Sequence, residues 1–120
     1  MEPVEINAGA WYLRSLRDDD RLSDVPALAL LGVADAAGYV ARAEAGWADE
    51  SLFIWAVCIP TTGETVALIG VQQTGPESGE LCGTARDGYA AALEAGAGPV
   101  SRFAAGALGL ETAPLANALP

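Results

Sequence analysis

The sequence predicts a single α+β domain over residues 1–120, with a mixed, mostly antiparallel central sheet flanked by helices. Its 120 residues, 52% of them hydrophobic, are enough to bury one core. Two apolar runs, Leu52–Ile59 and Thr65–Val71, flank a Pro-Thr-Thr-Gly-Glu turn and predict a hairpin of buried strands. Apolar residues at three- and four-residue spacing from Asp35 to Asp49 predict a helix before that hairpin.

Composition excludes several classes of function. The 16 acidic residues outnumber the 6 basic ones, all of them arginine, and the net charge of -10 excludes binding to a nucleic-acid backbone. The chain has no histidine, so Ser-His-Asp and Cys-His catalysis are impossible and the commonest zinc ligand is missing. We expect no metal site. Catalysis would have to use carboxylates, tyrosines, serines or backbone dipoles.

Cysteine usage and hydropathy predict a cytoplasmic protein without a membrane partner. Cys58 and Cys82 lie inside apolar, strand-like runs, which favours buried, reduced thiols over a reactive pair. The acidic start of the chain, Met1–Glu5, does not resemble a secretory signal. No apolar run approaches the ~20 residues that a membrane-spanning helix needs.

The first elements expected along the chain are a strand and two helices. Trp11–Arg17 predicts a strand that stops at Asp18–Asp20, which we interpret as a solvated turn rather than a metal site. A short helix is expected over Ser23–Leu31, capped by Ser23 or Asp24 and with proline in its first turn. Gly32 then separates it from the helix over Asp35–Asp49.

Two aromatic residues of the second helix have two possible roles. Tyr39 and Trp47 lie on its apolar stripe, where aromatic side chains usually pack in a core. The alternative is that they line a substrate pocket. The pattern itself is compatible with both roles.

The second half of the chain predicts a third strand, a glycine loop and a last helix. Gln72–Gly79 is expected to be a loop, followed by a strand over Glu80–Arg86 that stops at an Asp-Gly pair. A small-residue loop is expected from Leu93, leading into a helix over Pro99–Leu108 that Gly109 caps. Leu110–Leu115 would be an edge strand, because Pro114 cannot donate to a ladder.

The expected glycine loop has the features of an anion site. Gly96 and Gly98 can take positive φ and bring the backbone close to a ligand, and Pro99 suits the first position of a helix. The free N–H groups of a helix N-terminus commonly hold phosphate. The alternative is a simple turn, in which glycine is selected for its conformation alone.

Several motifs resemble those of the GNAT superfamily of N-acetyltransferases when they are taken in order. The run Leu-Arg-Ser-Leu-Arg-Asp-Asp-Asp over residues 13–20 resembles the Leu-Arg-x-Leu-Arg-x-x-Asp opening of that superfamily. Trp55-Ala56-Val57, Thr62-Gly63-Glu64 and Leu68-Ile69-Gly70 resemble its second and third strands with their hairpin. Further matches are Glu80-Leu81 with Gly83, for the fourth strand, and residues 107–111, for the last helix and fifth strand. The resemblance covers residues 10–116 and implies a C-terminally truncated GNAT-like fold.

The resemblance also implies site residues. The family's loop after the fourth strand, Gln/Arg-x-x-Gly-x-Gly/Ala, holds the pyrophosphate of acetyl-coenzyme A (acetyl-CoA), and the residues matched to this cofactor-binding loop are Gly96, Ala97, Gly98 and Ser101. Glu80 matches the start of the fourth strand and is the candidate general base, or else an exposed strand-end carboxylate. Leu93, Glu94 and Pro99 depart from the loop pattern, and Pro99 removes an N–H group.

Two functions follow as expectations. The first is an acetyl-CoA-dependent N-acetyltransferase acting on an unidentified amine of a small molecule or peptide. The alternative is a catalytically inactive GNAT-like binding module that associates with itself or with another protein. The resemblance ends before the family's last helix, last two strands and tyrosine. A sheet that ends there would expose its fifth strand, so we expect a homodimer or a heteromeric protein partner.

Overall fold

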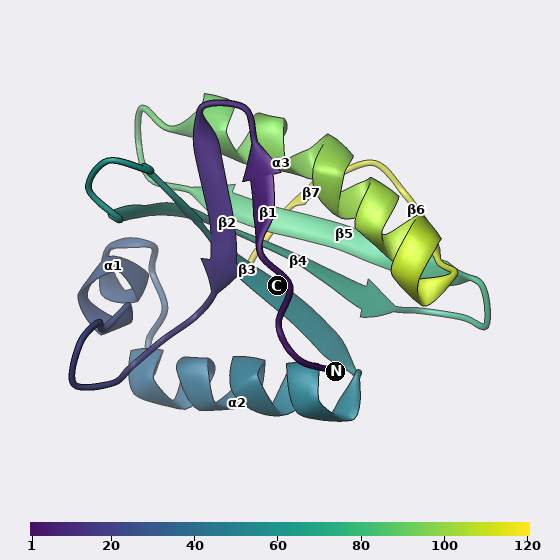
Figure 1. The fold of residues 1–120 in the computed structure, drawn as a ribbon, viewed down its shortest axis with the longest axis horizontal. Coiled ribbons are helices and arrows are strands. Elements are labelled where there is room, and N and C mark those ends of the chain that lie inside the picture. The colour runs from purple at the N-terminus through teal and green to yellow at the C-terminus, as the bar shows by residue number, and fades with distance from the viewer.

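The computed structural model describes all residues from 1 to 120 and has an α+β fold built on one curled sheet. Figure 1 shows helix α3 above the strands and helix α2 below them. The strands are β1 (Ile6–Ala8), β2 (Trp11–Ser15), β3 (Leu52–Cys58), β4 (Thr65–Gln73), β5 (Ser78–Ala85), β6 (Glu111–Thr112) and β7 (Ala116–Asn117). The helices are α1 (Val25–Leu30), α2 (Ala36–Asp49), α3 (Ala90–Phe103) and a π-helical turn, η1 (Ala104–Leu108).

The sheet is antiparallel over most of its width, in the order β1-β2-β3-β4-β5-β6. The last two strands both run parallel to β5, and α3 provides the crossover connection that parallel neighbours need. Their pairing with β5 is interrupted between Gly79 and Cys82, because the chain from Ala113 to Leu115 separates β6 from β7. The predicted edge strand over Leu110–Leu115 is therefore split in two, with Pro114 between the parts.

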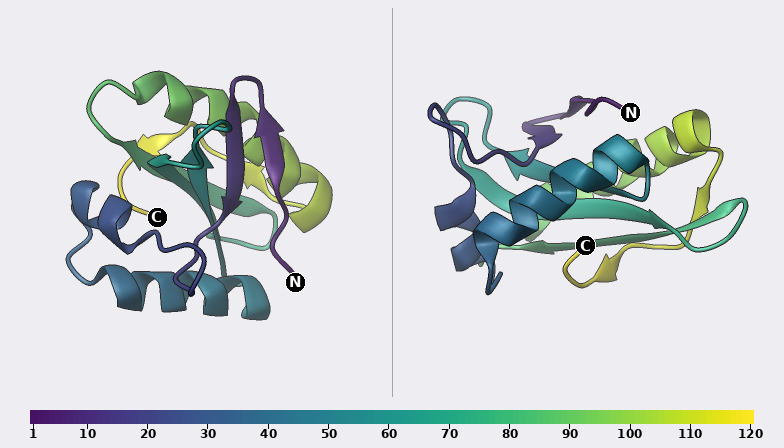
Figure 2. Two further views of the ribbon diagram at one scale, coloured as in Figure 1. Left: turned by 60° about the vertical axis from the view of Figure 1, so that its left-hand side comes forward. Right: turned by 90° about the horizontal axis from the view of Figure 1, so that it is seen from below.

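Hydrophobic side chains cover both faces of the sheet. Figure 2 shows the helices on the two sides of the strands from two further directions. On one face Leu13, Val57 and Ile69 pack against α3. On the other face Ala56 and Leu68 pack against α1 and α2. The central strands β3 and β4 are buried on both faces, which confirms the prediction from their continuous apolar runs.

Trp47, near the end of α2, closes an unpaired edge of β3. Strand β2 pairs with β3 only as far as Trp55, so the start of β3 has no neighbouring strand on that side. The Trp47 indole N–H donates a hydrogen bond of 3.1 Å to the carbonyl of Ile54, and its ring makes edge contacts with Phe53 and Trp55. The tryptophan thus satisfies a backbone group that a longer β2 would have paired.

Helix α3 corrects the expectation of a glycine loop at residues 93–98. The helix begins at Ala90 and runs through Gly96 and Gly98 to Phe103. Neither of these two glycines has a positive φ. Helical glycine costs about 1 kcal/mol relative to alanine, but the helix buries Leu93 and Val100 against the sheet, and this packing outweighs the two glycines. Pro99 is tolerated inside the same helix.

Other boundaries also differ from the prediction. Strands β4 and β5 extend through Gln73 and from Ser78, so the expected loop over Gln72–Gly79 shrinks to a tight turn. The helix predicted over Ser23–Leu31 begins at Val25 and ends at Leu30, with Asp24 at the N-cap position. Asp35 caps α2 as expected, since its carboxylate accepts a hydrogen bond from the Gly38 N–H group at 3.2 Å.

Candidate functional site

A buried polar network joins β2, α1 and β4, and sequence reasoning missed it. The Arg14 guanidinium donates two hydrogen bonds to the Asp24 carboxylate, at 2.8 and 2.9 Å. The Thr65 hydroxyl donates a third bond to that carboxylate at 2.8 Å, and the Arg17 backbone N–H a fourth at 2.7 Å. These bonds outweigh the cost of burial, so the pKa of Asp24 lies below its ordinary value. The only available signal was an arginine inside an otherwise apolar strand.

Glu80 lies on β5 opposite Gln72, with its side chain exposed. Its carboxylate contacts no other candidate site residue through a hydrogen bond or an ion pair. Burial raises the pKa of the nearby Cys82 thiol, and the Glu80 charge adds to that rise. Cys58 and Cys82 are both free and buried, which confirms the prediction of reduced core thiols.

The residues expected to cradle a cofactor lie within α3 and do not form a loop. Gly96 is buried against Leu13 and Ile69, and Gly98 lies one turn before Arg102. Backbone N–H groups in the middle of a helix are used by its own carbonyl groups. The Ser101 hydroxyl shares a hydrogen bond of 2.8 Å with the Thr112 hydroxyl. The loop expected at Gly96, Ala97, Gly98 and Ser101 is therefore wrong, while their role in holding a cofactor stays a prediction.

Tyr39 and Trp47 are both buried in the core, but at different places. The Tyr39 hydroxyl donates a hydrogen bond of 2.8 Å to the carbonyl of Pro120, and burial raises its pKa to about 12. Trp47 lies two turns further along α2 and lines a cavity to which Tyr39 does not belong. The structure therefore gives each aromatic residue a packing role and does not unite them in one pocket.

The helix N-terminus that follows the last long strand lies at Tyr89–Ala90, several residues before the expected position. It borders a cavity of about 410 Å³ formed with the ends of β5 and β7. Arg86 is the one basic side chain of that lining, and it already has partners. Its guanidinium is 2.6 Å from the Glu64 carboxylate and lies over the Tyr89 ring, 5.8 Å from the ring centroid. The acidic side chains of the same lining are Asp87 and Glu94.

This arrangement disfavours a phosphate group at the start of α3. Two unpaired carboxylates repel an anion, and they oppose the favourable field of the helix N-terminus. Recruiting Arg86 to a phosphate would require breaking its contact with Glu64. The charge of this cavity is therefore unsuited to a pyrophosphate.

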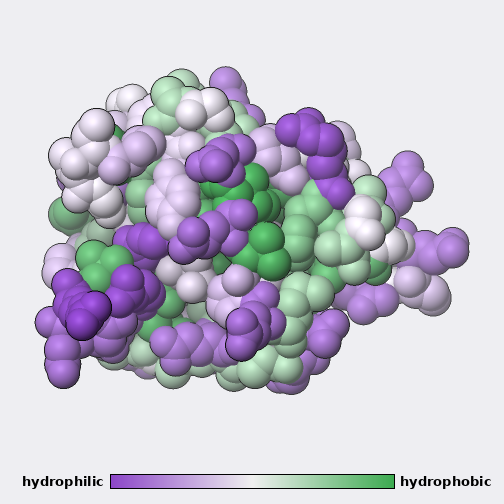
Figure 3. Space-filling view, viewed as in Figure 1, coloured by the Kyte–Doolittle hydropathy of each residue, from purple (hydrophilic) through white to green (hydrophobic).

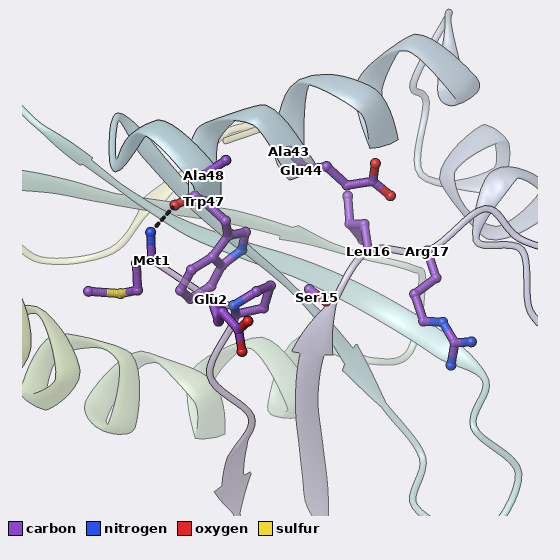
Figure 4. A pocket seen from close by; sticks show the side chains of 10 residues that line it. Met1, Glu2, Ser15, Leu16, Arg17, Ala43, Glu44, Trp47 and Ala48 are labelled. Atoms are coloured by element: carbon purple, nitrogen blue, oxygen red, sulfur yellow. Dashed lines mark hydrogen bonds between the residues drawn. The ribbon is translucent and has the colours of Figure 1, made fainter.

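A second cavity, of about 480 Å³, lies between the C-terminal half of α2, the end of β2 and the first residues of the chain (Figure 4). Figure 4 shows Met1 and Glu2 on one side of it, and Arg17 and Glu44 on the other. The Met1 amino group is held by the Trp47 carbonyl at 3.1 Å and lies 3.6 Å from the Glu50 carboxylate. The lining residues are Met1, Glu2, Pro3, Ser15, Leu16, Arg17, Ala43, Glu44, Trp47 and Ala48.

No known protein family model, no curated protein and no solved structure matches this chain. None of its helices has both the length and the apolar character needed to cross a bilayer.

Proposed function

We propose that this chain is a GNAT-like binding module that does not transfer acetyl groups and that associates with another protein. The observation that carries the proposal is the charge at the start of α3. In the family that the sequence resembles, the N–H groups after the fourth strand hold the cofactor pyrophosphate. The corresponding turn here carries Asp87, and its Arg86 is paired with Glu64. Glu94, from α3, lines the same cavity.

The surroundings of Glu80, the candidate general base, support the same proposal. Glu80 is exposed on β5, and Tyr39, a candidate for the substrate pocket, donates its hydroxyl to the backbone of Pro120. The end of the chain also covers the sheet beside Glu80, since the Leu119 carbonyl lies 3.9 Å from the Cys82 sulfur. A general base needs an open path to an acceptor amine and an acyl donor next to it. Glu80 has no hydrogen bond or ion pair that would hold it in place as a base.

Acetyl transfer is the second candidate, and the path of the sheet favours it. A parallel strand lies beside β5, and their pairing is interrupted at Glu80–Leu81. Acetyltransferases of the GNAT type use a backbone N–H of their fourth strand to polarise the thioester carbonyl, and β5 holds that place here. This candidate requires that a thioester enter beside Leu81.

Release of free thiol from acetyl-CoA tests the proposal. The protein is incubated with millimolar acetyl-CoA and a panel of primary amines, and the thiol is measured over time. We expect the rate of the protein-free control. A faster rate that Glu80→Gln abolishes would establish acetyl transfer and overturn the proposal.

A heteromeric partner is favoured over a second copy of the chain. Each copy carries a net charge of -10, so two copies repel each other over most of their surface. The sheet edges are also short, with three residues in β1 and two each in β6 and β7. Short edges offer little backbone for strand pairing between copies.

A further inference from the structure

We propose that the cavity between α2, the end of β2 and Met1–Pro3 receives one large apolar side chain of a basic protein segment. Arginine or lysine residues next to that side chain would face Glu2 and Glu44. This inference rests on the proposed partner-binding function, and it names the surface and the chemistry of the partner.

The floor of the cavity is apolar and firmly held. Its base consists of core residues, Leu16, Ala43 and Trp47, which are only 2%, 1% and 1% exposed. The apolar surface that a ligand can reach above them comes from Met1, Pro3 and Ala48. The Trp47 ring is fixed by its hydrogen bond to Ile54 and by aromatic contacts. A volume of about 480 Å³ over such a floor suits a bulky side chain, and the site is formed before the partner arrives.

The rim of the cavity is negatively charged and not neutralised. Glu2 and Glu44 take part in no ion pair. The two cations of the lining are offset by carboxylates outside it. Arg17 lies 2.9 Å from the Asp19 carboxylate, and the Met1 amino group lies 3.6 Å from the Glu50 carboxylate. An apolar floor below two free carboxylates is complementary to an apolar side chain with cationic neighbours.

The net charge of the molecule also favours a basic partner. At -10 the chain attracts basic segments over a distance and speeds their association at low ionic strength. A second copy of the chain would bring equal negative charge to the rim. A basic segment of another protein is therefore the occupant that both the cavity and the whole molecule favour.

Nuclear magnetic resonance with capped tripeptides tests this inference on the full chain. The probe is acetyl-Arg-Phe-Arg-amide, and the backbone amide signals of a nitrogen-15-labelled sample report where it binds. We expect saturable shifts centred on residues 15–17 and 43–48. Acetyl-Glu-Phe-Glu-amide tests the need for positive charge, and acetyl-Arg-Gly-Arg-amide tests the need for the apolar side chain. Both are expected to give no saturable shifts.

Variants with matched controls locate the site. Ala48→Leu fills the cavity from an exposed position of α2 and should abolish binding, whereas Ala45→Leu, also exposed on α2 but outside the lining, should not. Glu44→Gln should weaken binding about two- to fivefold, as expected for one solvent-exposed ion pair, and Glu77→Gln in the distant β4–β5 turn should leave it unchanged.

Three results would overturn the inference. They are an absence of saturable shifts with the Arg-Phe-Arg probe, equal binding of the Glu-Phe-Glu probe, and equal effects of Ala48→Leu and Ala45→Leu. Each is independent of thiol release from acetyl-CoA. Failure of this site is therefore distinguishable from failure of the proposed function.

Discussion

At the scale of single residues, the ion pair between Arg14 and Asp24 fixes α1 to the sheet. Both side chains are almost fully buried, at 9% and 2% exposed. None of the fully buried side-chain nitrogen and oxygen atoms of this pair or of Thr65 lacks a hydrogen-bond partner. A buried pair of this kind contributes little net stability compared with apolar residues, but it is costly to break, because the remaining charge stays buried and unpaired.

Replacing one partner of this pair should destabilise the protein strongly. Asp24→Asn leaves the Arg14 charge without a counter-ion and is expected to lower the free energy of unfolding by about 3–5 kcal/mol, measured by urea denaturation at neutral pH. Asp19→Asn, which breaks the exposed contact with Arg17, is the control and should have a much smaller effect. Equal effects of the two variants would contradict the account.

The same pair predicts how stability depends on pH. The pKa of Asp24 is lower in the folded protein than its ordinary value of 3.8, so the carboxylate adds stability above that value. This contribution is lost as the pH falls from about 4 through the pKa that Asp24 has in the folded protein. The stability difference between the wild type and Asp24→Asn should therefore narrow below about pH 4, and a constant difference would count against the ion pair.

At the scale of elements, α3 shows how packing overrides local sequence signals. The predicted loop depended on two glycines and a proline in close succession, which are common in turns. The structure extends the helix through them because Ala92, Leu93, Gly96 and Val100 share one buried face. That face has helical spacing, and extending the periodic pattern back from Val100 would have revealed it.

Replacing Gly96 with alanine tests whether α3 is a helix at this position. A Cβ atom at Gly96 would lie 3.6 Å from Leu13 and Ile69, which is ordinary contact, so Gly96→Ala should raise the free energy of unfolding by about 0.5–1 kcal/mol. Gly88→Ala is the control. Gly88 has a φ of 86°, which alanine adopts only at a cost, so this substitution should lower the free energy of unfolding. Destabilisation by Gly96→Ala would favour the loop instead.

Much of the fold was predictable from hydrophobic pattern, whereas the site was not. The continuous apolar runs of β3 and β4 and the periodic stripe of α2 identified these elements within a residue or two. The contacts that define the cavities are different in kind. Arg86 meets Glu64 across 22 residues, and the Met1 amino group meets Trp47 across 46. No local pattern encodes such pairings, because they depend on the assembled sheet.

At the scale of the whole molecule, negative charge is the dominant surface property. Figure 3 shows hydrophilic residues surrounding a hydrophobic area on one face. A net charge of -10 would repel the phosphates of a nucleotide-like cofactor from one cavity and attract a basic protein segment to the other. The net charge therefore supports both proposals, that the chain does not bind acetyl-CoA and that its partner is basic.

Calorimetric titration of acetyl-CoA into the protein tests this central claim most directly. We predict no heat of binding at millimolar ligand and no difference between the wild type and Ala90→Glu, which adds a carboxylate at an exposed position in the first turn of α3. Saturable binding to the wild type that Ala90→Glu abolishes would contradict the claim, because it would place the cofactor phosphates at the start of α3.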